Sequence, residues 1–306
     1  MKVVMDCDTG HDDALAILLA ARHLDLIGVT TVFGSSTVAN TTDNTLRVLA
    51  LVGLDVPVIA GCGAPMLGTT QQSAPTHGRT GLDGAQLPST TREPEDCHAV
   101  DFLIDAARKY REELVMVATG PLTNLAIALR KEPRLASWIG EVSIMGGSAG
   151  VGNRTPAAEA NFASDPEAAS IVLAAGMQCH LVGYDLTRTF GLTEDDIATL
   201  AASESAVAQA VAGLQQFYLL KQREIFGLAY APIHDPCAVL RYVSPSSIEY
   251  ESTSVQIELA GKWTRGMSVY DRRGVPNPEG CPVQRATSID VETAISAVLA
   301  AVKSYT

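Results

Sequence analysis

The sequence predicts an α/β protein with an open, mostly parallel twisted sheet of the Rossmann-like kind, helices on both faces, and a C-terminal β-hairpin and helix. Two observations support this class. Over the first two thirds of the 306 residues, short apolar runs alternate with helix-length amphipathic stretches, which implies crossover connections between parallel strands. After residue 193 the pattern changes to two helical stretches and then to polar–apolar alternation. No linker or repeat interrupts the pattern, so residues 1–306 are expected to form a single domain.

The individual elements follow from this alternation. Apolar runs of strand length predict parallel strands at 2–5, 26–32, 56–60, 114–118, 142–145 and 180–182. Helical periodicity predicts helices at 12–21, 41–51, 122–129, 166–175, 193–202, 206–226 and 291–302. Alternation over 255–259 predicts the hairpin, with one face in water. The longest irregular segment, 61–94, is expected to be an active-site loop, and both Trp138 and Trp263 are expected to pack.

Composition restricts the partners and the compartment. Lys plus Arg number 22 against 34 Asp plus Glu, a net charge of -12, so phosphate backbones and anionic lipid are repelled and no nucleic-acid partner is expected. No apolar run approaches the roughly 18 residues that would span a bilayer, so no membrane partner is expected. Six cysteines lie scattered without a CxxC pair, and the chain starts without a signal-peptide core. These features predict a cytoplasmic protein with free thiols.

An acidic cluster follows the first expected strand. Four carboxylates fall within eight residues, at Asp6, Asp8, Asp12 and Asp13. Ligands of parallel α/β sheets bind outside the carboxyl ends of the strands. Crowded carboxylates there repel one another unless a cation or shared protons intervene, and helix capping alone does not account for four acids. A hard divalent ion is the simplest remedy, Ca²⁺ in a roomy carboxylate-rich site or Mg²⁺ in a largely hydrated one.

Rival interpretations of this cluster remain open at this point. An EF-hand loop would need a glutamate where Ile17 stands, so that reading fails. The pair Asp6 and Asp8 also fits a Mg²⁺-dependent phosphatase with an aspartate nucleophile, although that leaves the adjacent acids Asp12 and Asp13 unexplained. A third possibility is a calcium-stabilised sugar-binding protein without turnover.

The cluster belongs to a longer series of motifs. Residues 6–14 read DCDTGHDDA and resemble the DxDxGxDDA signature of the nucleoside hydrolases, the inosine-uridine-preferring N-ribohydrolase family. Further segments match the family in order: ATGPLTN at 118–124, MGG at 145–147, 153–161 with DPEA at 165–168, and HDP at 234–236. The resemblance implies hydrolysis of ribonucleosides to ribose and free nucleobase by a metal-activated water.

The resemblance also implies roles for particular residues. The family's metal is Ca²⁺, and its ligands carry over to Asp8, both oxygens of Asp13, the backbone carbonyl of Thr119, and Asp235. Asp8 is expected to act as general base as well. His234, beside a metal ligand, is expected to protonate the departing nucleobase.

The sugar is expected to bind a second group of residues. By resemblance, Asp12 binds the ribose 2′ and 3′ hydroxyls, and Asn153, Glu159 and Asn161 hold the remainder of the sugar. The sequence departs from the family at Ala160, where an aromatic residue is common.

The nucleobase side is less defined. His77 matches a family loop histidine near the base. Pyrimidine-preferring members use a Gln and a Tyr one helical turn apart; Gln222 is a candidate for the first, but Phe226 follows one turn later and cannot donate a hydrogen bond. Tyr230 replaces it only if the helix ends differently, so purine against pyrimidine stays open. The family also implies a homodimer or homotetramer.

Overall fold

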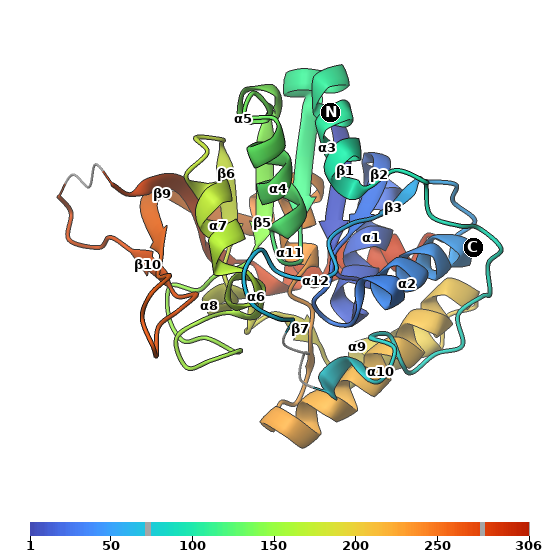
Figure 1. Ribbon diagram of the computed structural model, residues 1–306. Helices are drawn as coiled ribbons and strands as arrows, with labels where there is room; N and C mark the ends of the chain where they lie inside the picture. Colours follow the sequence, from blue (N-terminus) through green and yellow to red (C-terminus); the bar gives the residue numbers. More distant parts are fainter. Residues whose placement is uncertain (71–74, 276–278, 306) are drawn as a thin grey trace.

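The computed structural model describes residues 1–70, 75–275 and 279–305, and within them a central sheet of nine strands (Figure 1). Its strands run in the order β10-β9-β11-β6-β5-β4-β1-β2-β3. They are β1 (Lys2–Cys7), β2 (Asp25–Thr31), β3 (Val58–Ala60), β4 (Leu114–Ala118), β5 (Glu141–Met145), β6 (Cys179–Val182), β9 (Ile248–Ile257), β10 (Ser268–Tyr270) and β11 (Cys281–Ile289). A separate small pair consists of β7 (Gly191–Leu192) and β8 (Ala231–Pro232).

Strand direction confirms the predicted fold class. The strands from β3 to β6 pair in parallel, β11 continues the parallel set beside β6, and β9 pairs antiparallel with both β11 and β10. The order β3-β2-β1-β4-β5-β6 reverses direction between β1 and β4, which is the switch point where doubly wound sheets bind ligands. Asp6 is in register with Ala118, so the chain leaves β1 and β4 side by side at the same sheet edge.

Helices cover both faces of the sheet. They are α1 (His11–His23), α2 (Val38–Leu51), α3 (Ala99–Tyr110), α4 (Thr123–Lys131), α5 (Leu135–Trp138), α6 (Ala160–Ser164), α7 (Pro166–Leu173), α8 (Tyr184–Thr187), α9 (Glu194–Ala201), α10 (Ala206–Phe226), α11 (Pro236–Val243) and α12 (Val291–Lys303). Short 3₁₀ turns are η1 (Pro75–His77), η2 (Arg111–Glu113) and η3 (Pro245–Ser247). Because side chains alternate along a strand, Val3 and Met5 join one core with α1, α2 and α10 to α12, whereas Val4 joins the other with α3 to α5 and α7.

Several elements differ from the expectation. The helix α3 was not predicted, since its N-cap is His98, whose ring accepts the Val100 N–H, and histidine gives no usual start signal. The hairpin is longer than expected and joins the main sheet through β11, a pairing that no local pattern reveals. Trp138 packs as expected, but the expectation for Trp263 is wrong: it lies in the turn after β9 and is 78% exposed.

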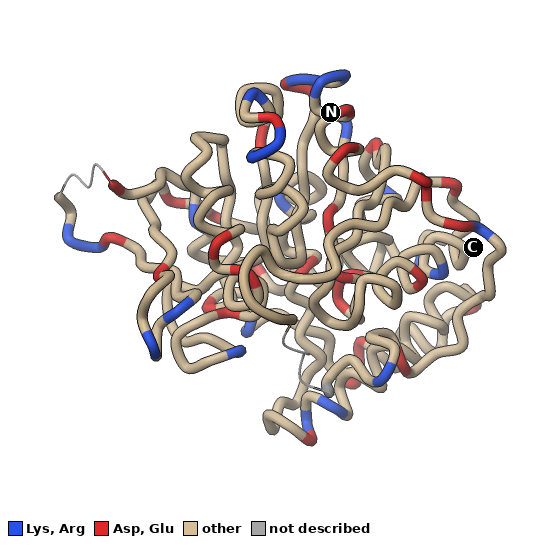
Figure 2. Tube along the Cα trace, in the orientation of Figure 1, with Lys and Arg blue, Asp and Glu red and all other residues tan. Residues whose placement is uncertain are grey.

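The loop and the charge pattern bear on function. Among the described residues of 61–94, η1 is the only regular element, so the expected irregular loop is present. Lysine and arginine are dispersed over the chain rather than gathered in one stripe (Figure 2). None of the helices in the described ranges has the length and apolar character needed to cross a membrane.

Candidate active site

A cavity of about 350 Å³ opens at the carboxyl edge of the sheet. Its wall is built by the chain segments that leave β1, β4 and β5, by the loop containing η1, and by α8, α10 and the start of α11. Every residue that the sequence analysis assigned to a site lines it: Asp8, Asp12, Asp13, His77, Thr119, Asn153, Glu159, Asn161, Gln222, Phe226, Tyr230, His234 and Asp235. The structure therefore brings together residues from the whole span between the first strand and α11.

Four buried aspartates form the acidic floor of the cavity, namely Asp8, Asp12, Asp13 and Asp235. Each is at most 7% exposed. Carboxylate oxygens of Asp12, Asp13 and Asp235 lie within 4.8 Å of one another. Because hard cations prefer several oxygen ligands at short range, this spacing is suited to a metal ion.

Local backbone structure fixes two of these carboxylates. Asp13 lies in the first turn of α1, where its Oδ2 accepts the Gly10 N–H at 2.9 Å and its Oδ1 accepts the Thr119 hydroxyl at 2.7 Å. Asp8 Oδ2 accepts the backbone N–H of Ser35. A Cβ at Gly34 would lie 2.1 Å from that same Asp8 oxygen. The glycine is therefore required for the loop after β2 to approach Asp8.

The ionised form of the acidic floor has no positive side chain paired with it among the residues that the structure describes. Burial, followed by the charge of Asp13, raises the pKa of Asp12 to about 7. Burial also raises the pKa of Asp8, Asp13 and Asp235, and in Asp8 and Asp235 neighbouring carboxylates raise it further. In the described part of the chain, no ion pair involves any of the four. Such an arrangement favours a bound cation.

Asp6, the remaining acid of the sequence cluster, does not line the cavity. It is part of β1, and its Oδ1 accepts the Thr30 hydroxyl at 2.6 Å and the Asn124 amide at 2.8 Å. Burial raises the pKa of Asp6 to about 6. The Asp6 carboxylate therefore connects β1 to β2 and α4 in the protein interior, outside the cavity.

Glu159 and Asn161, which the sequence assigns to the sugar, organise one side of the cavity. Glu159 caps α6: its Oε1 accepts the Asn161 N–H at 2.8 Å and its Oε2 accepts the Gly147 N–H at 2.8 Å. Asn161 donates its amide to the carbonyl of Thr119 at 2.8 Å and to that of Met145 at 3.1 Å, so it bridges the ends of β4 and β5. Burial raises the pKa of Glu159 to about 7.

Two histidines lie on the other side of the cavity. His234 Nδ1 lies 2.9 Å from the Thr187 hydroxyl, and burial lowers the pKa of this histidine to about 4. His77 lies in η1 with its Nδ1 3.1 Å from that of His11, and its ring stacks on Tyr218 with centroids 5.0 Å apart. Contacts with His11 and Tyr218 therefore fix the orientation of the His77 ring.

The end of α10 supplies the rest of this wall. Gln222 is buried, whereas Phe226, in the last turn, is 52% exposed. The helix stops at Gly227, whose φ of 69° is the left-handed conformation that favours glycine. The reversed chain then brings Tyr230 to the cavity, where its hydroxyl donates to the Arg188 carbonyl.

Sequence reasoning missed several lining residues. Arg154 directly follows Asn153, and Tyr184 and Arg188 lie on and just after α8, which follows β6 at the carboxyl edge. Position after a strand end could have identified these three. Tyr218 precedes Gln222 by one helical turn and shares its face of α10. It is 2% exposed, so its pattern is that of a core residue.

The fold and the cavity define a class of protein. A cavity at the switch point of a doubly wound sheet, with a floor of carboxylate oxygens and a few convergent amide and imidazole groups, is typical of an α/β enzyme that binds a small polar molecule. Residues 3–296 match the family described as "Inosine-uridine preferring nucleoside hydrolase", and the chain belongs to this family.

Relatives agree with this assignment. The chain is 40% identical over 277 residues to the pyrimidine-specific ribonucleoside hydrolase RihA of Shewanella woodyi, covering 89% of each chain. It is 36% identical to RihB of Escherichia coli strain SE11, covering 95% of this chain and 93% of the relative. The solved purine-preferring ribonucleoside hydrolase from Gardnerella vaginalis is 30% identical, with a TM-score of 0.93 over 99% of this chain and 98% of that one. The protein is thus a ribonucleoside hydrolase, which decides against the phosphatase and binding-protein alternatives.

Proposed function

We propose that this enzyme cleaves the N-glycosidic bond of ribonucleosides in a Ca²⁺-dependent reaction, releasing ribose and a free nucleobase. The observation that carries the proposal is the acidic floor, four buried carboxylates that form no ion pair within the described residues. Buried like charges are costly unless a counter-ion accompanies them. A divalent cation at this position is the simplest way to balance them.

The donor set fits calcium. Asp8, Asp13 and Asp235 offer carboxylate oxygens and Thr119 offers a carbonyl, all in the lining of one cavity. A carboxylate oxygen of Asp12 also lies within 4.8 Å of those of Asp13 and Asp235, and Asp12 is assigned to the sugar instead. Ca²⁺ accepts roughly six to eight such ligands in a flexible geometry, whereas Mg²⁺ keeps much of its water. When bound, Ca²⁺ would offset the carboxylate charge and polarise a water molecule for attack.

Asp8 is the proposed general base. The Ser35 N–H fixes one of its carboxylate oxygens, and the other is assigned to take the proton of the attacking water. Burial and its acidic neighbours raise its pKa in the metal-free chain, and a bound Ca²⁺ would lower it again toward the ionised form that a general base needs. Direct attack by water predicts inversion at the anomeric carbon.

The sugar is assigned to Asp12, Asn153, Glu159 and Asn161. These side chains line one region of the cavity, and hydrogen bonds within the protein orient Glu159 and Asn161. Contacts to the sugar hydroxyls that strengthen as the ring gains oxocarbenium character lower the barrier. The negative surroundings favour the same developing positive charge.

Protonation of the leaving nucleobase is assigned to His234. With Nδ1 engaged by Thr187, its Nε2 is the nitrogen left for the base. The pKa of about 4 that burial produces keeps the free imidazole neutral at pH 7, so protonation of the base requires the imidazolium form, which contacts to the bound substrate would have to stabilise. The imidazolium then passes its Nε2 proton to the leaving nitrogen as negative charge accumulates there and returns to neutral imidazole.

Pyrimidine ribonucleosides are the proposed preferred substrates. RihA and RihB, at 40% and 36% identity, are both described as pyrimidine-specific. Gln222 and Tyr230 both line the cavity, which supports a polar contact to the base, although the Tyr230 hydroxyl also bonds to Arg188. Relative kcat/KM values for uridine, cytidine, inosine and adenosine test this preference.

Metal removal tests the proposal as a whole. Turnover of uridine should fall at least a hundredfold after treatment with a chelator and return on addition of Ca²⁺, more fully than with Mg²⁺. Unchanged turnover in a protein shown by elemental analysis to be metal-free would refute the calcium role. The homodimer or homotetramer implied by the family is proposed as well, and light scattering of the purified protein measures it.

A further inference from the structure

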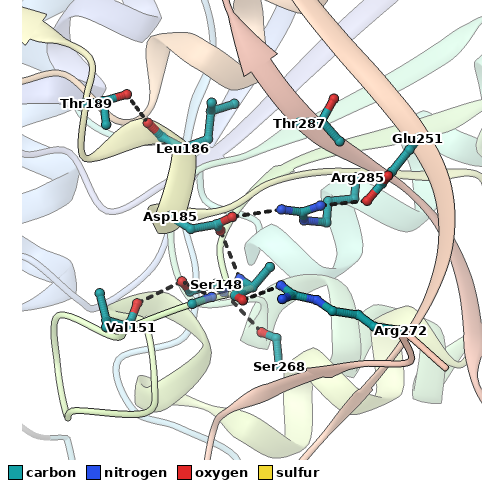
Figure 3. Close-up of polar contacts among 12 residues, drawn as sticks. Ser148, Val151, Asp185, Leu186, Thr189, Glu251, Ser268, Arg272, Arg285 and Thr287 are labelled. Atoms are coloured by element: carbon teal, nitrogen blue, oxygen red, sulfur yellow. Dashed lines mark hydrogen bonds and ion pairs between the residues drawn. The ribbon is translucent and has the colours of Figure 1, made fainter.

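The C-terminal strands β9 to β11 contact segments that line the cavity, although none of their own described residues lines it. Within the described residues, the lining of the cavity ends at Asp235. These strands nevertheless reach the segments that line it through a cluster of polar contacts, drawn in Figure 3. At the centre of this cluster lies Asp185 in α8, with Arg285 of β11 on one side and the loop after β5 on the other.

Asp185 makes two different contacts with its two carboxylate oxygens. Oδ1 accepts the backbone N–H of Ala149 at 2.9 Å, and Oδ2 pairs with Arg285 at 3.0 Å. Arg285 in turn pairs with Glu251 of β9 at 2.6 Å. The side chains of Asp185 and Arg285 are 23% and 18% exposed, so this pair is shielded from water more than the surface pairs of the chain.

The loop after β5 is fixed from the opposite side as well. Arg272, which follows β10, donates to the carbonyl of Ala149, and the hydroxyl of Ser268 in β10 accepts the Ser148 N–H at 3.3 Å. The Ser148 hydroxyl donates to the Val151 carbonyl at 2.8 Å, which closes the loop on itself. Both polar groups of the Ala149 backbone therefore have side-chain partners that come from distant parts of the sequence.

Both segments joined by Asp185 line the cavity. The loop leads to Asn153 and Arg154, on the sugar side. The helix α8 carries Tyr184, which lines the cavity, and Thr187, whose hydroxyl contacts His234. The two segments are also joined by a backbone hydrogen bond, from the Tyr184 N–H to the Gly147 carbonyl, 2.8 Å long.

We propose that Asp185, anchored by Arg285, is a positioning residue for hydrolysis: it couples the sugar-side loop to α8, so that Asn153 and Arg154 meet the substrate in a fixed place. The proposal rests on the sugar-binding role proposed above for this loop. It assigns a catalytic consequence to the C-terminal strands, whose pairing between β9 and β11 is made by main-chain groups and not by the ion pair. Loss of Asp185 should therefore loosen the loop and leave the sheet folded.

The experiment compares Asp185→Ala, Asp185→Asn and Arg285→Met with the parent enzyme in saturating Ca²⁺. Asp185→Ala should raise KM for uridine about tenfold or more, with a smaller fall in kcat, because misplaced binding groups weaken substrate positioning. Asp185→Asn keeps an acceptor for Ala149 and should lose less. Arg285→Lys, which retains the charge, should recover most of the loss of Arg285→Met. Hydrogen–deuterium exchange should increase at residues 147–154 in Asp185→Ala.

A matched control comes from another ion pair made by the C-terminal strand region. Arg265, in the turn between β9 and β10, pairs with Glu167 of α7 at 2.8 Å. Its side-chain hydrogen bonds within the described residues go to Glu167 and the Leu259 carbonyl, and none goes to residues 147–154. Arg265→Met should leave KM and exchange of residues 147–154 at parent values. Equal kinetic losses in Arg265→Met and Asp185→Ala would reduce the effect to general destabilisation and overturn the proposal.

Two further readouts separate this proposal from the proposed function. Ca²⁺ affinity, measured by calorimetry, should stay at the parent value in Asp185→Ala, since Asp185 is not part of the acidic floor. Parent-like KM and kcat in Asp185→Ala overturn the positioning role, whether or not exchange in the loop increases. Failure of calcium to support turnover in the parent enzyme would instead overturn the calcium proposal and leave the comparison of KM values intact.

Discussion

The two ends of the parallel strands carry carboxylates in opposite electrostatic situations. At the carboxyl end, burial and mutual repulsion raise the pKa of the acids of the floor, to about 7 in Asp12. At the amino end, Glu141 opens β5 and lies 3.2 Å from His180 Nε2 and 3.3 Å from the Arg241 guanidinium. The hydrogen bond from His180, aided by Arg241, lowers the pKa of Glu141 to about 2.

The difference lies in the partners and not in the residue type. Glu141 obtains a hydrogen-bond donor and a cation from the fold, His180 and Arg241, so its ionised form stabilises the folded chain. The acidic floor has no ion-pair partner among the described residues, so its ionised form costs stability until a cation arrives. The acid Glu141 at the amino edge is thus balanced by the protein alone, whereas the acids at the carboxyl edge are proposed to be balanced by a bound cation.

Removing one acid of the floor should have the largest effect. Asp8→Ala takes away the proposed general base and a proposed metal ligand, so kcat for uridine should fall by about 10³-fold or more. Steady-state kinetics at saturating Ca²⁺, with metal content measured in parallel, gives the answer. Near-parent turnover with unchanged calcium occupancy would remove Asp8 from both roles.

Asp235→Asn should change stability in opposite directions with and without metal. In the absence of calcium, burial and the neighbouring carboxylates raise the pKa of Asp235, so folding at pH 7 disfavours its ionised form. The variant has no such group, and its Tm should rise by about 2–4 °C. In excess calcium the parent should gain about 2.7 kcal/mol at a hundred times Kd, whereas the variant should gain much less. The two melting curves are therefore expected to change order on addition of Ca²⁺.

Scanning calorimetry of both proteins, each with chelator and with Ca²⁺, measures this exchange of order. Glu159→Gln is a matched control, since it also removes a buried acid that lines the cavity but is not a proposed ligand. It should leave the calcium-dependent rise in Tm in place. A parent protein whose Tm does not respond to Ca²⁺ would contradict the account of the carboxyl edge.

Much of the carboxyl edge could be predicted because its residues are close together in the sequence or directly follow a strand. Asp8, Asp12 and Asp13 lie within one strand-to-helix connection, and like charges that close together demand an explanation whatever the rest of the fold. Thr119 follows a recognisable strand, and parallel strands end at a common edge. Asp235 could be added only through the family motif, since nothing near it in the sequence indicates where it lies.

The remainder could not be predicted because it depends on tertiary pairing. Asp185 and Arg285 are a hundred residues apart, and each alone has the pattern of an ordinary surface charge. Their meeting depends on β11 lying in parallel beside β6, which neither strand's own sequence specifies. Tyr218 has the burial pattern of a core residue although it also lines the cavity. The positions of these residues depend on long-range strand register, which the sequence does not reveal, whereas most of the acidic floor could be recognised from charges that are close in the sequence.

The smallest expected effect concerns the amino edge. Glu141→Gln should lower the free energy of unfolding by about 1–2 kcal/mol at pH 7, after allowance for solvent screening of its partly exposed pair, and leave kcat/KM unchanged. The pKa of Glu141 falls from 4.5 to about 2 on folding, so its contribution is complete above pH 4.5 and is lost as pH falls toward 2. The stability difference between parent and variant should therefore shrink from pH 5 to pH 3.

Urea unfolding at pH 7, 5, 4 and 3 tests this sign, with Asp105→Asn as the control. Asp105 pairs with Arg108 on the exposed face of α3, where both side chains are more than half exposed. Its loss should change stability by less than about 0.5 kcal/mol, because solvent screens exposed pairs. A Glu141→Gln difference that grows on acidification would mean that the carboxylate is repelled in the folded state, and the two sheet edges would then share one electrostatic character.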